Sequence, residues 1–213
     1  MSAKSIVFAA LCALLLAANN VWAEWVDDLY VAQTPVPDRS QSARDVASRD
    51  ALAQVIVKVS GSLSIVEDPR LRDSLAQAPD FVQQYSYVEV EDGLAARFEF
   101  DASLLSAALS EAGVPMWTAN RPAVILWLVV QDVYGRQFIN SDSYPELAQA
   151  VQESFARRGV PVVLPLFDLA DSASVTADDV WRLSAPVVAG ASARYNAQNQ
   201  LMGRLAPLQS SGT

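Results

Sequence analysis

The sequence predicts two folded units in one chain: an α+β unit followed by an α/β unit with a small, mainly parallel sheet. Three observations lead to this. In the first half, helix-like stripes are mixed with a hairpin. From residue 123 onward, buried strands alternate with helices, which is the order of a parallel sheet with helices on its faces. A short turn-rich stretch separates the two patterns. We therefore assign the α+β unit to residues 24–116, a junction to 117–122 and the α/β unit to 123–213.

Residues 1–23 have the three parts of a cleaved export signal. Lys4 is the positive charge, an apolar core runs from Ile6 to Ala18, and small residues precede the expected cut after Ala23. The core is too short for a permanent anchor, since a spanning helix takes about 20 residues. Cys12, the only cysteine, lies inside this core and not at the cut, so a lipoprotein is excluded. We expect export to the periplasm of a Gram-negative bacterium.

The charge of the chain excludes one large class of function. The whole sequence has 24 acidic and 15 basic residues, and removal of the signal with Lys4 leaves 14 basic residues and a net charge of −10. Such a field disfavours nucleic acid and anionic lipid surfaces. The two apolar runs after the signal are each only nine residues long, which is the size of buried strands. We expect no stable membrane insertion after cleavage.

The α+β unit is expected to begin with a strand near 24–36 and a helix over 38–61. Asp38 and Gln41 have the spacing of a capping box, and Gly61 ends the helix. Asp68 and Pro69 predict a second, short helix. The core stripe of the long helix is formed by Leu52, Val55, Ile56 and Val59.

Residues 85–101 predict a hairpin. A two-residue turn at 92–93 would put a charge on the apolar face, so we expect a three-residue loop, 91–93, which pairs Val88 with Ala96. Asp101 then caps a helix that Gly113 ends. Its expected stripe is Leu104, Leu105, Ala108 and Leu109.

The α/β unit begins with a continuous apolar strand, 123–130. A helix over 143–159 follows, with a capping box formed by Ser143 and Glu146 and an end at Gly159. A second buried strand, a helical stretch kinked at Pro186 and a third strand complete the pattern. Their ranges are 160–167, 177–195 and 200–206. No further strand follows, so the C-terminal part of this unit is expected to be incomplete.

The residue types exclude several chemistries. The sequence has no histidine, which removes histidine-based nucleophilic and acid–base sites and the usual zinc sites. No glycine-rich phosphate loop is present, so we expect no cofactor. Lys58, the only lysine after the signal, lies beside Ser60 and Ser62. A Ser–Lys hydrolase uses such a pair, but a lysine at a helix C-terminus is the favoured interpretation.

Two carboxylates are candidate catalytic residues, as the alternative to a non-enzymatic function. Asp132 and Asp168 each follow a buried strand, on the side where open α/β sheets bind ligands. A carboxylate pair there would serve acid–base work on a sugar or a peptide. Aspartates also end strands for turn reasons alone. The acid-rich stretch 168–179 lacks the spacing of a calcium loop, and Asp178 and Asp179 fit the first turn of a helix capped by Thr176. We therefore expect no metal.

Trp117, Asn120 and Arg121 are the candidate residues for binding a partner. An exposed aromatic residue beside an arginine has the composition of an interface hot spot. The other interpretation, which we favour, packs Trp117 between the two units with Arg121 bridging to acidic side chains.

Five segments in order give the chain a family resemblance: LYVAQTPVPDRS, ALAQVIVKVSGS, FVQQYSY, ANRPAVILWLVVQD and GVPVVLPLFDLAD followed by DVW. Together they resemble the exported proteobacterial proteins catalogued as domain of unknown function 2066. The resemblance implies periplasmic residence and a shared architecture, and it implies no activity and no catalytic residues. Members continue beyond the point that matches Gly203–Leu205, which adds to the expectation that this unit is incomplete.

These observations predict a soluble periplasmic protein that acts by binding. We expect a non-enzymatic envelope adaptor or accessory factor with an envelope protein as its partner. A carboxylate-dependent hydrolase and a small-ligand carrier are the alternatives.

Overall fold

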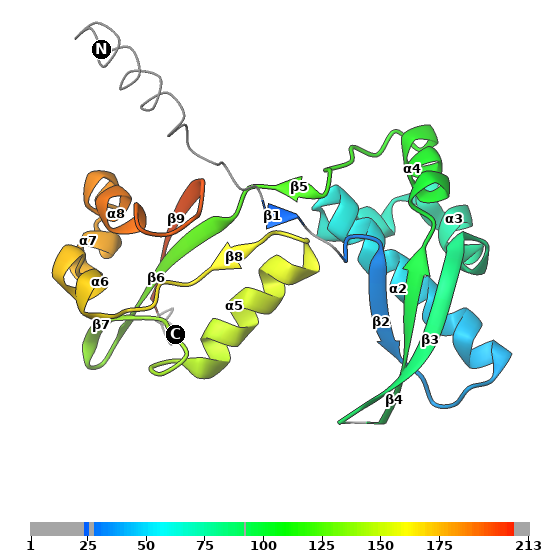
Figure 1. Ribbon diagram of the computed structural model, residues 1–213, viewed down its shortest axis with the longest axis horizontal. Helices are drawn as coiled ribbons and strands as arrows, with labels where there is room; N and C mark the ends of the chain where they lie inside the picture. Colours follow the sequence, from blue (N-terminus) through cyan, green and yellow to red (C-terminus); the bar gives the residue numbers. More distant parts are fainter. Residues whose placement is uncertain (1–23, 26–27, 92, 207–213) are drawn as a thin grey trace, which may run out of the picture.

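The computed structural model describes residues 24–25, 28–91 and 93–206, and it contains helices and mixed sheets, as the predicted α+β content requires. Figure 1 shows two groups of elements, one from β2 to α4 and one from β6 to β9, with β1 and β5 between them. The predicted signal and the last residues, 207–213, lie outside the described residues. No helix in the described part is long and apolar enough to cross a membrane.

The first group is a three-stranded antiparallel sheet covered by one long helix. The sheet has the order β2-β4-β3, and α2 packs against it with its buried stripe. All four predicted stripe residues of α2 are buried, as are Phe98 and Phe100 of β4. The bounds are β2 Val31–Pro35, α2 Gln41–Ser60, η1 Leu63–Glu67, η2 Pro69–Leu71, α3 Arg72–Ala76, η3 Ala78–Phe81, β3 Val82–Val90, β4 Gly93–Phe100 and α4 Ala102–Glu111.

The beginning of α2 differs from the prediction, and its end agrees with it. The N-cap is Ser40, whose hydroxyl accepts a hydrogen bond from the amide of Ala43. Asp38 accepts instead from the amide of Ser40, two residues before the helix. The capping box at Asp38 was therefore wrong, because Ser40 is the residue with extended backbone directly before the first turn. Gly61 ends the helix in the left-handed region, with a φ of 74°.

The predicted hairpin exists, but its register was wrong. Val90 pairs with Gly93, so Val88 lies opposite Ala95 and not opposite Ala96. In this register Tyr85 lies opposite Phe98, and the two rings approach to 6.4 Å between centroids. Aromatic pairs across a sheet are a stabilising contact. The predicted loop of 91–93 placed Ser86 opposite Phe98, whereas the observed register places Tyr85 there.

Two helix predictions in the first group hold in part. Asp101 caps α4 as expected, and Asp68 accepts a hydrogen bond from the amide of Arg70 at the start of η2. Of the stripe expected for α4, Leu105 and Leu109 are fully buried, whereas Leu104 is exposed.

The second group is a mixed sheet around β6 (Val124–Asp132). β9 (Asn199–Leu205) and β8 (Val162–Val163) pair with it in parallel, and β7 (Gly135–Phe138) pairs with it in antiparallel fashion. Strand β7 was not predicted from the sequence. One face of β6 packs against α5 (Pro145–Arg157) through Leu126 and Leu128. The other face carries Trp127 and packs against the helices α6 Leu169–Ser174, α7 Ala177–Trp181 and α8 Ala185–Ser192.

Two helix boundaries in this group were predicted wrongly. The N-cap of α5 is Tyr144, without a side-chain hydrogen bond, and the amide of Ser143 donates to Asn140, so Ser143 is not a cap. Pro145 occupies the first turn, where its missing N–H costs nothing. The kinked helix over 177–195 is instead two helices, because the backbone turns at Leu183 with a φ of 56°. The capping box of α7, between Thr176 and Asp179, is present as predicted.

Candidate functional site at the junction of the two groups

Arg121 is the centre of the junction. It lies in β5 (Asn120–Arg121), which pairs with β1 (Glu24–Trp25), and its side chain is fully buried. A guanidinium has five N–H donors, and here five hydrogen bonds of 2.8–2.9 Å reach five backbone carbonyl oxygens. These belong to Lys58, Trp117, Thr118, Arg158 and Gly159.

Three of the five carbonyls that hold Arg121 lie at the ends of two helices. Lys58 is in the last turn of α2, and Arg158 and Gly159 follow directly after α5. Helix C-termini have unpaired carbonyls and a partial negative charge, which a buried cation neutralises. Burial lowers the pKa of Arg121, and the electrostatic interaction with Tyr30 raises it. The expectation that Arg121 bridges to acidic side chains was wrong, since these bonds reach backbone oxygens of both groups.

Trp117 lies against this arginine. The guanidinium carbon of Arg121 is 4.5 Å from the ring centroid, and the amide of Trp117 donates to the carbonyl of Val59 in 2.8 Å. The indole keeps 38% of its surface exposed. The structure therefore brings Trp117 and Arg121 together, while Asn120 lies next to them in β5 with an exposed side chain.

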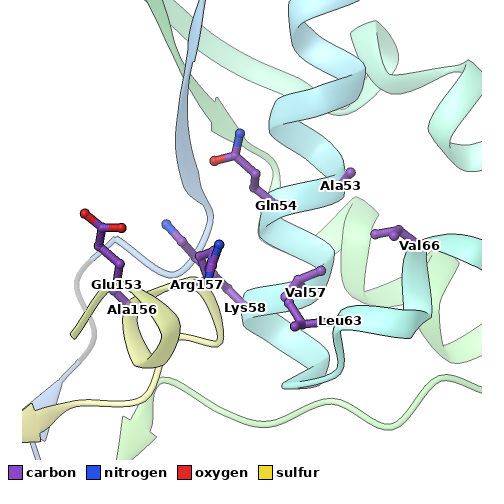
Figure 2. Close-up of a pocket in the computed structure, with 9 residues that line it drawn as sticks. All are labelled: Ala53, Gln54, Val57, Lys58, Leu63, Val66, Glu153, Ala156 and Arg157. Carbon is purple, nitrogen blue, oxygen red and sulfur yellow. The ribbon is translucent and has the colours of Figure 1, made fainter. Parts of the chain in front are cut away.

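A cleft opens beside this junction, between α2 and α5. It has a volume of about 630 Å³ and is walled by one helix from each group, together with η1. Figure 2 shows its charged side chains at one end and Val57, Leu63 and Val66 at the other. The lining residues are Ala53, Gln54, Val57, Lys58, Leu63, Val66, Glu153, Ala156 and Arg157.

Lys58 connects the cleft to the first sheet. Its ammonium group donates to the carbonyl oxygens of Val31 (2.7 Å) and Asp28 (3.4 Å). Burial lowers the pKa of Lys58, and the charge of Asp28 opposes that shift. The Ser60 hydroxyl donates to the carbonyl of Val57. A Ser–Lys pair is therefore not formed, and Lys58 does more than neutralise the end of its helix.

The charged residues contributed by α5 have different surroundings. Glu153 accepts a hydrogen bond of 2.9 Å from Gln149 on the same helix. The guanidinium of Arg157 makes no hydrogen bond or ion pair within the described part of the chain. This cleft was not predicted from the sequence, because α2 and α5 are about 85 residues apart and only the packing at Arg121 brings them together.

Asp132 and Asp168 each have partners of their own. Asp132 accepts from the Tyr144 hydroxyl (2.6 Å) and from the Tyr134 amide, and the Tyr144 hydrogen bond lowers its pKa. Asp168 caps α6 and binds Arg194 in 2.6 Å, which holds its pKa far below the ordinary range. A general acid needs a pKa near the working pH. These environments favour turn and capping roles for both residues.

A smaller cavity of about 180 Å³ lies under α6, next to Trp127, Phe138 and Phe167. Its buried carboxylate, Asp171, accepts hydrogen bonds from the Phe167 amide and the Tyr195 hydroxyl and forms an ion pair with Arg194. These partners satisfy both of its oxygens. Across the described ranges, no cluster of three potential ligand side chains is arranged to hold a metal ion.

Comparison with known proteins gives one match. The family described as Domain of unknown function (DUF8605) matches residues 23–118, which is less than half of the chain. This match covers the first group of elements and ends within the junction, beside Arg121. No curated protein and no solved structure matches the chain. The resemblance to the family catalogued as 2066 stays a prediction.

Proposed function

We propose that this chain is an exported, non-enzymatic binding protein of the cell envelope, an adaptor or accessory factor, and that its binding site is the cleft between α2 and α5. One observation carries the proposal: the cleft is walled by one helix from each group, and the ends of both helices are bound to the same buried arginine. Ligand sites occur preferentially in such clefts between units.

An occupant of this cleft contacts both groups at the same time. Its binding energy therefore depends on the relative position of α2 and α5, which Arg121 sets through bonds to Lys58 and Gly159. This dependence is what an adaptor needs in order to report occupancy to a partner. We also infer that the elements from β6 onward form an α/β unit, since β8 and β9 both pair with β6 in parallel.

The periplasm is the proposed location. The supporting features are the order of charge, apolar core and small residues in 1–23, and a remaining chain without cysteine. The small-ligand carrier is a second candidate, because a volume of about 630 Å³ is in the range of small-molecule pockets. The variant with Asp132→Asn and Asp168→Asn separates the hydrolase alternative from both. An adaptor should keep its partner in this variant, whereas a hydrolase should lose turnover and keep its fold.

The test is site-specific photocrosslinking in the full chain, expressed in its own host. The photoreactive residue replaces Ala156 in the cleft, and a matched chain carries it at Ala185, an exposed helical alanine in α8. The proposal predicts a recurrent crosslinked partner or ligand from position 156 only. Identical products from both positions, or none from 156, would contradict it.

A further inference from the structure

We propose that the cleft between α2 and α5 binds a single-chain anionic amphiphile, with its carboxylate at Lys58 and Arg157 and its hydrocarbon chain along Val57, Leu63 and Val66. This inference rests on the proposed function and names the class of ligand for the same site. It depends on the separation of charged and apolar residues within the cleft.

The apolar end of the cleft favours a hydrocarbon chain as ligand. Five of the nine lining residues have aliphatic side chains. Leu63 is one of the large hydrophobic side chains that stay exposed, at 45% of its surface. A hydrocarbon chain that covers this surface gains free energy with each methylene that leaves water.

The charged end of the cleft favours an anionic head group. Among the lining residues, Lys58 and Arg157 supply two positive charges against the single carboxylate of Glu153. Asp28, which lies near Lys58 outside the lining, is itself paired with Arg97. Lys58 uses two of its three N–H donors on carbonyl oxygens. Arg157 has no partner among the described residues, and its fork geometry matches a carboxylate.

The volume of the cleft is that of a small-molecule site. About 630 Å³ lies within the range of pockets that bind small molecules. The residues that line the cleft come from α2 and η1 on one side and from α5 on the other (Figure 2). Binding should therefore tighten with chain length, by up to about fourfold per methylene, until the apolar end is filled.

The test is calorimetric titration of the full chain with decanoate, below the concentration at which decanoate self-associates, and with hexanoate and 1-decanol for comparison. We expect decanoate to bind more tightly than either. Arg157→Gln should weaken decanoate binding at least fivefold, while Glu153→Gln should strengthen it, because a like charge beside the head group is removed. Ala156→Trp should abolish binding by filling the cleft.

Arg49→Gln is the matched control, since it makes the same charge change at an exposed position of α2 outside the cleft, and it should leave the affinity unchanged. Absence of decanoate binding would overturn the inference, as would equal affinity for 1-decanol or unchanged binding in Ala156→Trp. Each variant is checked for its unfolding transition first. If position 156 still crosslinks a recurrent partner while decanoate fails to bind, the ligand class is wrong and the proposed function stands.

Discussion

The Nη1 atom of Arg121 donates a 2.8 Å hydrogen bond to the carbonyl oxygen of Gly159, and a Cβ atom at position 159 would lie 2.5 Å from that same nitrogen. The glycine therefore serves two purposes. It ends α5 with a φ of 63°, and it leaves the space through which the guanidinium of Arg121 reaches the helix end. Because Gly159 has no Cβ, Arg121 can bond the end of α5 and so join the second group of elements to the first.

Replacement of Gly159 by alanine should lower the free energy of unfolding by roughly 2–4 kcal/mol, from the left-handed backbone and the crowded nitrogen together. Urea unfolding of the full chain measures this. Gly190→Ala is the matched control, because a Cβ there meets no atom within 4 Å and Gly190 lies on an exposed helical surface. That variant should gain about 0.5–1 kcal/mol. Equal effects at both sites would disprove the role of Gly159.

Replacement of Arg121 by methionine should lower the free energy of unfolding by roughly 3–5 kcal/mol. Methionine keeps the apolar volume but removes the donors of all five hydrogen bonds to the carbonyls. Arg121→Lys should be intermediate, because three donors on a point charge cannot reproduce the fork of five. Chemical denaturation gives both values. A loss below 1 kcal/mol for methionine would show that the junction does not depend on this residue.

The features that depend on local sequence pattern were predicted correctly. The stripe of α2, the continuous apolar strand β6, the cap at Asp101 and the capping box at Thr176 follow from spacing over a few residues. The choice between Asp38 and Ser40 as a cap depends on which residue has extended backbone just before the first turn, and composition does not reveal this.

The candidate site was predictable only in part. Trp117 and Arg121 were identified by residue type, and their contact is present. The five carbonyl acceptors of Arg121 were not identified. Backbone carbonyls occur at every position, and only tertiary packing selects those at Lys58 and Gly159. The cleft depends on the same packing, since its two walls are distant in sequence.

The caps of the second group give a further comparison. Thr176→Ala should lower the free energy of unfolding by about 1 kcal/mol, because the Thr176 hydroxyl accepts a hydrogen bond from the amide of Asp179 at the start of α7. Ser143→Ala, at the position that sequence spacing wrongly favoured, should change it by less than about 0.5 kcal/mol. Thermal or urea unfolding tests both. A reversed order would mean that Ser143 is the true cap of α5.

The carboxyl group of Asp68 should titrate well below its ordinary pKa of 3.8. The Arg70 guanidinium, bound in 2.6 Å, lowers the pKa of Asp68 to about 2. Because the folded-state pKa is the lower one, this contribution to stability is present above about pH 4 and is lost as the pH falls through about 2. NMR titration of the carboxyl carbon measures it. Arg70→Gln should return the midpoint toward 3.8, and an unchanged midpoint would exclude Arg70 as the cause.

The central claim is that Arg121 fixes the width of the cleft between α2 and α5. The most direct measurement is the distance distribution between spin labels at Asp50 of α2 and Gln152 of α5, both exposed, in the full chain with Cys12 replaced by serine. The account predicts one narrow distribution for the wild-type junction and a broadened one for Arg121→Lys. A narrow distribution that Arg121→Lys leaves unchanged would contradict it.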